Sequence, residues 1–273
     1  MLLLVAGCGF SLEPPAEMVD APPPDVPPDI AATWTIDPSS GKGAPATAAE
    51  WTSLIAVRNL NVDPPQGLWP MQDLASGTGL IDVTGNVDLG VRNSPLFRQP
   101  VLGWTRLAVG MPDFSNREFY NNTDASLPDV ATTSMTVLLV FQILDIPNPP
   151  GIRSILFGGS GIQGRRADVE LDGNLRLRIG INGTYASGTV NYGSAVIPML
   201  LKLDVTNMQQ KILTSQELVQ LPYVPLQGSR GLVLGGANNP SPDLRCLYMA
   251  AWYGTSAEIS DADLRAMLSA LGW

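Results

Sequence analysis

The chain has 273 residues, 45 % of them apolar and 15 % charged, with 27 glycines and 24 prolines, a composition that predicts a globular all-β domain with many tight turns and excludes a disordered chain. Its net charge is −9 and no Lys or Arg precedes Lys42, which argues against nucleic acid as a partner. Histidine is absent, so His-based triads and imidazole metal ligands are excluded.

The first eight residues, MLLLVAGC, end in a pattern that resembles a bacterial lipobox, in which small residues precede a lipidated Cys. Because a signal peptide needs an apolar run of about 7–15 residues, residues 1–8 are interpreted as a truncated signal with Cys8 as the lipidation site. The alternative is a short apolar N-terminus with an incidental cysteine. Residues 9–33 carry seven prolines and five acids without a base, which predicts an extended, disordered stalk. We therefore expect a bacterial cell-envelope protein, an outer-membrane lipoprotein or a secreted one, that meets the membrane only through a lipid anchor.

Residues 34–65 are predicted to form an N-terminal extension with one helix. Thr47 and Glu50 make a capping box in front of an apolar residue, Trp51. The prolines of Asp63-Pro64-Pro65 are expected to end the helix. We expect the extension to pack on one edge of the domain that follows.

Short apolar runs separated by Gly, Pro, Asn and Asp fill the chain from residue 66 onward, for example residues 136–144, 196–205, 231–236 and 246–254. Strands at this spacing, without amphipathic helices between them, predict an all-β sandwich or barrel. A second capping box, Ser260 with Asp263, precedes apolar residues at helical spacing. It predicts a short C-terminal helix that lies on the sandwich.

Three stretches resemble the concanavalin A-like lectin/glucanase superfamily and, within it, a laminin G-like domain. They are LWPMQDLASGTGLIDVTGN (68–86), TSMTVLLVFQI (133–143) and GLVLGGANNPSPDLRCLYMAAWYGTSAEISDADLRAMLSALGW (231–273). The resemblance rests on element order and loop character over 66–273. It implies an antiparallel two-sheet β-sandwich, a jelly roll that often holds a sugar or Ca²⁺ at its rim. It also implies an enzymatic alternative, because one branch of the superfamily cleaves β-glucans with carboxylates that alternate along a strand.

Three carboxylates alternate with apolar residues in the stretch ADVELDGNLRLRIG (167–180): Asp168, Glu170 and Asp172. The glucanase pattern resembles Glu-x-Asp-x-Glu, whereas this chain has the shorter Asp at both outer positions. Residues i and i+4 of a strand lie about 13 Å apart, and a retaining glycosidase needs carboxyl groups about 5–5.5 Å apart. No catalytic residue is therefore predicted.

The same stretch also predicts a hairpin with charged residues on its outer face. A three-residue loop, 172–174, sets Glu170 opposite Arg176 and Asp168 opposite Arg178, with all apolar residues on the other face. Ion pairs of this kind hold the pKa of a carboxyl down, which is the wrong direction for a general acid. We expect a solvated, salt-bridged hairpin face.

Candidate ligand contacts lie in two polar segments. Tyr185 and Tyr192 occur among Asn, Ser, Thr and Gly in residues 181–194, where a ring can stack on a sugar and amides can bind its hydroxyls. The alternative is an edge hairpin whose tyrosines cover the core. The loop at 235–245 offers three oxygen ligands for a sugar or for Ca²⁺, the one cofactor left open: Asn238, Asn239 and Asp243.

Together these features predict a laminin G-like sandwich over residues 66–273 that serves as a cell-surface binding or adhesion module. Its expected partner is a glycan or a surface protein, recognised at the rim loops. Two alternatives stay open. One is a glycoside hydrolase that uses the strand carboxylates, and the other is a purely structural assembly domain.

Overall fold

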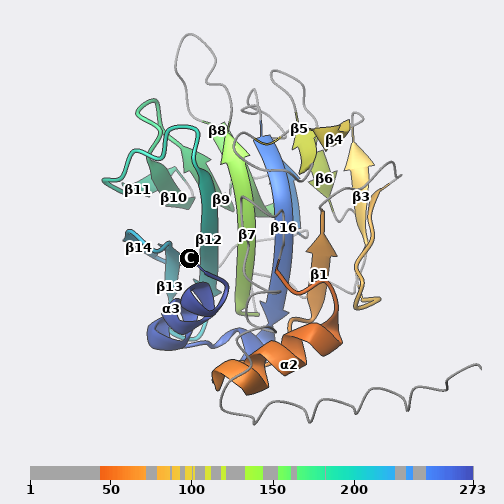
Figure 1. Ribbon diagram of the computed structural model, residues 1–273. Coiled ribbons are helices and arrows are strands. Elements are labelled where there is room, and N and C mark those ends of the chain that lie inside the picture. Colours follow the sequence, from red (N-terminus) through yellow and green to blue (C-terminus); the bar gives the residue numbers. More distant parts are fainter. Residues whose placement is uncertain are drawn as a thin grey trace, which may run out of the picture.

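The computed structural model describes residues 44–71, 79–86, 88–92, 96–99, 101, 108–111, 118–120, 133–143, 153–160, 165–181, 183–224, 232–235 and 244–272 (Figure 1). Within these residues the chain forms two antiparallel sheets that lie face to face. The predicted sandwich is confirmed, and the apolar runs expected to be strands are strands β7, β12, β15 and β16.

The first sheet has the strand order β14 (Leu218–Pro222), β13 (Gln209–Leu213), β12 (Val196–Asp204), β7 (Met135–Ile143), β16 (Leu244–Tyr253), β5 (Ala108–Met111), β4 (Leu96–Gln99), with β1 (Gly67–Pro70) also paired to β16. The second sheet has the order β11 (Thr184–Ser187), β10 (Leu177–Ile181), β9 (Arg165–Leu171), β8 (Arg153–Ser160), β15 (Leu232–Gly235), β6 (Glu118–Tyr120), β3 (Leu89–Arg92), β2 (Gly79–Leu80). Strands β7 and β16 pair along nearly their whole length at the centre of the first sheet.

Helix α2 (Ala48–Arg58) begins at the predicted capping box, with the Thr47 hydroxyl accepting a hydrogen bond from the Glu50 N–H. It ends earlier than predicted, at Asn59, because that residue adopts the left-handed conformation that closes a helix (φ 49°). The C-terminal helix α3 (Asp261–Ala270) starts at its N-cap Ser260 as predicted, and a 3₁₀ turn, η1 (Gly254–Ala257), lies a few residues ahead of it. Neither helix of the described residues combines the length and the hydropathy that a membrane-spanning helix requires.

Apolar packing occurs on both faces of the first sheet. Along β7, Val137, Leu139 and Phe141 point into the core between the sheets, whereas Leu138 and Val140 point into a second core beneath the helices. Because both faces are covered, every residue of β7 and of β16 is buried. This explains why their sequences are continuous apolar runs and do not alternate.

The N-terminal extension packs across the face of the first sheet, not on its edge as predicted. Trp51 of α2 is fully buried, donates a hydrogen bond from its indole to the Tyr248 hydroxyl (2.7 Å), and meets Trp252 edge to face at 5.5 Å. The Tyr248 hydroxyl in turn donates to the Pro45 carbonyl (2.6 Å). Figure 1 shows α2 and α3 against the same end of this sheet, and no helix of the described residues packs on the outer face of the second sheet.

Candidate functional site

The β9–β10 hairpin sits at one end of the second sheet, and its loop is two residues longer than predicted. Leu171 pairs with Leu177 and Glu170 pairs with Arg178, so the loop spans residues 172–176. The Asp172 carboxylate causes this, because its Oδ1 accepts hydrogen bonds from two backbone N–H groups of the loop, those of Asn174 (2.8 Å) and Arg176 (3.0 Å). A shift of two residues leaves each side chain on its predicted face.

Two carboxylates of the hairpin bind arginines, with different partners from those predicted. Asp172 binds Arg176 (Oδ2 to Nη2, 2.7 Å), and Glu170 binds Arg178 (Oε2 to Nη2, 2.5 Å; Oε2 to Nε, 2.6 Å). The structure places Asp168 opposite Gly180 in the strand register, not opposite Arg178, and the Asp168 side chain lies outside the described residues.

The predicted solvated face is wrong at Glu170, whose side chain is only 1 % exposed. Its second oxygen, Oε1, is buried without a hydrogen-bond partner. The Arg178 side chain is 13 % exposed, so the pair has a low-dielectric environment in which the two charges depend strongly on each other. Asp172 is nearer the surface. Burial raises the pKa of Asp172, but hydrogen bonds from the Arg176 side chain and from the loop backbone outweigh burial and hold this pKa below its usual value.

Tyr185, one of the predicted ligand contacts, lies beside this ion pair on β11. Its ring is directly below the Arg178 guanidinium, with the Arg178 Cζ atom 3.9 Å from the ring centre. The ring also covers Gly180, where an added Cβ atom would come within 2.3 Å of it. Tyr185 as a whole residue nevertheless stays 37 % exposed. Glu170, Arg178 and Tyr185 therefore form one cluster, which we call the platform.

Tyr192, the second predicted tyrosine, has a structural position. The residue is 7 % exposed, and its hydroxyl lies 2.8 Å from the Thr214 hydroxyl and 3.1 Å from Glu217 Oε1, to which it donates. Burial and the nearby Glu217 charge raise the pKa of Tyr192 to about 12. This position corresponds to the alternative in which a tyrosine covers the core.

The remaining predicted residues lie outside the described residues: Asn238, Asn239, Asp243 and Cys8. Within the described part of the chain, no group of three or more Cys, Asp or Glu side chains converges as a metal site would require. The other cysteine, Cys246, is buried in β16, and burial raises the pKa of its thiol.

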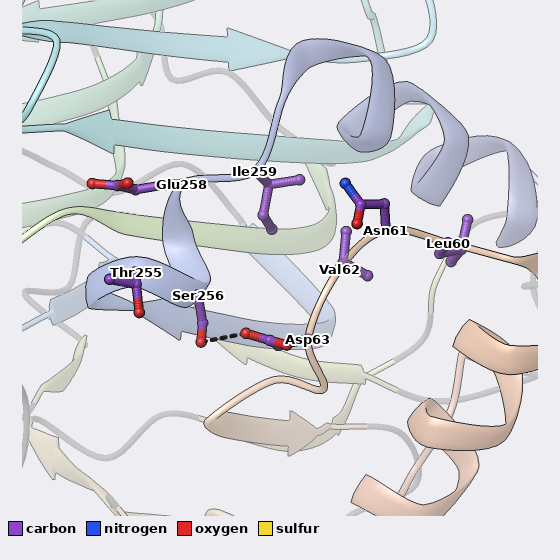
Figure 2. Close-up of a pocket in the computed structure, with 8 residues that line it drawn as sticks. All are labelled: Leu60, Asn61, Val62, Asp63, Thr255, Ser256, Glu258 and Ile259. Carbon is purple, nitrogen blue, oxygen red and sulfur yellow. Dashed lines mark hydrogen bonds between the residues drawn. The ribbon is translucent and has the colours of Figure 1, made fainter.

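A pocket that the sequence did not predict lies between the segment after α2 and the segment that joins β16 to α3 (Figure 2). Its volume is about 260 Å³, and its lining residues are Leu60, Asn61, Val62, Asp63, Thr255, Ser256, Glu258 and Ile259. The Ser256 hydroxyl donates to Asp63 Oδ2 across it (2.7 Å), a contact between residues 193 positions apart. No sequence pattern signals this pocket, because its two walls are distant in the chain and each resembles an ordinary connecting loop.

No protein-family model matches the chain, and no curated protein matches its sequence. Among solved structures, the chain is similar to Trypanosoma rangeli sialidase in complex with 2,3-difluorosialic acid, with a TM-score of 0.58 and 14 % identity over 89 % of this chain and 35 % of that one. It is also similar to the botulinum neurotoxin serotype D binding domain, with a TM-score of 0.53 and 13 % identity over 75 % of this chain and 51 % of that one. The chain thus spans about a third to a half of these proteins. At such identities the likeness establishes the fold alone, which is an antiparallel β-sandwich.

Proposed function

We propose that this chain is a glycan-binding module and that Tyr185, held in place by the buried Glu170–Arg178 pair, is its sugar-contacting residue. The observation that carries the proposal is the exposed Tyr185 ring, which is fixed by Arg178 on a sheet face that no described helix covers. The Arg178 guanidinium covers one face of the Tyr185 ring, so a sugar would meet the part of Tyr185 that stays exposed, whose carbon atoms can contact its C–H groups and whose hydroxyl can form a hydrogen bond.

Order at the platform favours binding, since a ring that is already immobilised loses little conformational freedom when a ligand arrives. The ion pair supplies this order. Glu170 holds the guanidinium of Arg178, and the guanidinium stacks on the Tyr185 ring.

Two similarities in fold support the same proposal. One neighbour is a sialidase, solved with a sialic acid derivative, and the other is the binding domain of a toxin. We further propose that this chain binds its glycan without cleaving it, because Glu170 and Asp172 are both held by arginines. The lipid anchor at Cys8 and display on the bacterial cell surface, as expected from the N-terminal sequence, belong to this proposal.

A glycan array tests the proposal, with Ca²⁺ and with a chelator in parallel. We expect the wild-type protein to bind a restricted set of glycans and Tyr185→Ala to bind them about tenfold more weakly, the equivalent of about 1.4 kcal/mol. Tyr185→Phe keeps the ring and should retain most of the affinity. Leu218→Ala is the matched control, because Leu218 is similarly exposed (38 %) but belongs to the other sheet.

Three results would contradict the proposal. Equal binding by wild type and Tyr185→Ala would show that the platform takes no part in glycan recognition. Binding to a surface protein without any response to sugars would favour an adhesion or assembly domain. Hydrolysis of a glycan that Glu170→Gln abolishes would favour the glycoside hydrolase alternative.

A further inference from the structure

We propose that strand β14 is a self-association surface, through which two copies of this chain pair edge to edge and form a dimer. β14 is the last strand of the first sheet, so one of its sides has no strand partner within the described residues. In Figure 1 it lies at the left margin of the molecule. The glycan site belongs to the second sheet, so dimer formation does not depend on glycan binding there.

The register of the β13–β14 hairpin determines which backbone groups of β14 face the open side. At one end the Thr214 N–H donates to the Glu217 carbonyl (3.0 Å), and at the other the Tyr223 N–H donates to the Met208 carbonyl (2.8 Å). Bonded and non-bonded pairs alternate along an antiparallel ladder, so every second residue of β14, starting at Val219, bonds β13. The residues between them turn their backbone groups to the open edge.

These edge residues are Leu218, Gln220 and Pro222, and all three are exposed. Leu218 and Gln220 each offer an N–H and a C=O to a pairing strand, whereas Pro222 has no N–H. A second strand can therefore use the stretch from Leu218 to Gln220 in full. Pro222 stops the pairing there, which is a common way to limit the addition of strands at an edge.

The stretch from Leu218 to Gln220 is complementary to a second copy of itself. When two β14 strands run antiparallel about a two-fold axis at Val219, Leu218 of each copy lies opposite Gln220 of the other. Each of these two pairs exchanges both of its backbone bonds, which gives a ladder of about four hydrogen bonds. Both strands are already ordered by their own sheets, so pairing costs less conformational entropy than the capture of a disordered peptide.

Charge favours the same partner. The chain has a net charge of −9, so two copies repel each other and can meet only where their surfaces are uncharged. The edge residues of β14 carry no charge, and the charged side chains beside them are bound within the chain. Glu217 accepts a hydrogen bond from the Thr189 N–H (2.7 Å), and Lys211 pairs with Asp261 (2.8 Å). A charged peptide would therefore gain no unpaired opposite charge from these residues.

Exposed apolar side chains concentrate at the same edge. Of the six large apolar residues that are exposed in the described part of the chain, three lie on β14 or next to the other end of its hairpin: Leu218, Met208 and Val224. Leu218 lies opposite Leu213, which is buried in the core beneath the helices, and so continues that apolar layer to the open edge. A ladder this short buries less than about 1,200 Å², so we expect a weak, reversible dimer.

Sedimentation velocity of the full chain measures the dimer directly. We would study the wild-type protein between about 1 μM and about 1 mM, with a reductant so that Cys8 cannot link two copies. We expect a monomer at the low end of this range and a reversible dimer at the high end. Added salt should strengthen the dimer, because it screens the repulsion between two copies of charge −9.

The first variant acts on the backbone of the edge. Gln220→Pro removes the N–H that faces the open side, leaves the bonds to β13, and should weaken the dimer at least about tenfold. Ser187→Pro is its matched control on β11, the edge strand of the second sheet. There the Gly188 N–H donates to the Leu177 carbonyl (2.7 Å), so the N–H of Ser187 faces outward. This control should leave the affinity within about twofold.

The second variant acts through charge. Leu218→Glu places a negative charge on both sides of the ladder and should also weaken the dimer at least about tenfold. Val83→Glu is its control, because Val83 is similarly exposed (46 %) and lies outside the β13–β14 hairpin; it should change the affinity less than about twofold. Leu218→Ala adds no charge and keeps the ladder, so it remains a valid control for the glycan array.

Urea unfolding checks that each variant keeps the stability of the wild type. Loss of the dimer in Gln220→Pro and in Leu218→Glu, with both controls still dimeric, would support the proposal. A monomer at every concentration, or a dimer unchanged in both variants, would overturn it. A dimer that Ser187→Pro or Val83→Glu disrupts to the same extent would also overturn it, because the contact would then lie elsewhere.

Discussion

Replacement of Arg178 by methionine should be among the most destabilising single changes in the β9–β10 hairpin. Methionine keeps much of the length and apolar volume of arginine but removes the charge, which leaves the Glu170 carboxylate buried without its cation. Removal of one partner from a buried ion pair costs about 3–5 kcal/mol. The lost contact with the Tyr185 ring adds about 0.5–2 kcal/mol.

Urea unfolding followed by tryptophan fluorescence measures this loss. With a slope of about 2–3 kcal/mol/M, the midpoint should fall by about 1–3.5 M at an unchanged slope. Arg176→Met is the matched control, because Arg176 forms an ion pair in the same hairpin but its side chain is 37 % exposed. That substitution should cost about 0–1 kcal/mol.

Equal losses in the two variants would refute the reasoning, because they would mean that burial does not distinguish the two pairs. A double variant offers a further check. Glu170→Met combined with Arg178→Met removes both charges and should recover part of the stability that Arg178→Met loses, since replacement of a whole buried pair by apolar residues is often nearly neutral.

Two more predictions concern the rest of the fold. Trp51→Ala should lower the free energy of unfolding by about 3–5 kcal/mol, because it removes a fully buried ring that also donates a hydrogen bond to Tyr248. Calorimetry would measure this loss. A loss below about 1 kcal/mol would show that the packing of α2 does not depend on Trp51. The folded-state pKa of Asp172 is lowered, so its ionised form stabilises the protein above the unfolded-state pKa of about 3.9, and this contribution disappears as the pH falls through the folded-state pKa. The difference in unfolding free energy between wild type and Asp172→Asn should therefore be constant between about pH 5 and 7 and shrink toward about pH 3. Unfolding titrations at several pH values would measure it. A difference that grew on acidification would contradict a lowered pKa for Asp172.

Local patterns predicted the local structure. Both helices begin at the capping boxes read from the sequence, because the bonds of Thr47 and of Ser260 each reach a residue only three positions away. The central strands were also evident from their apolar runs. The runs themselves did not reveal why they are continuous. The reason is that the helix layer covers one face of β7 and β16, through contacts such as that of Trp51 with Tyr248, and these two residues lie 197 positions apart in the chain.

The candidate site could be predicted only in part. Tyr185 stood out because it is aromatic and surrounded by small polar residues. The hairpin register was wrong by two residues, because the loop length depends on which N–H groups the Asp172 carboxylate reaches. Burial of Glu170 could not be predicted either, since strand alternation places a charged residue on the outer face without revealing that Arg178 will cover it.

The position of α2 has a practical consequence for work with fragments of this protein. A fragment that starts at β1, where the resemblance to laminin G-like domains begins, would lack Trp51 and Leu54 and would expose the apolar side chains of the first sheet that these residues cover. Such a fragment should be prone to self-association and aggregation. Expression that starts ahead of Ala44 keeps this surface sealed, so residues 44–66 are best treated as an integral part of the folding unit.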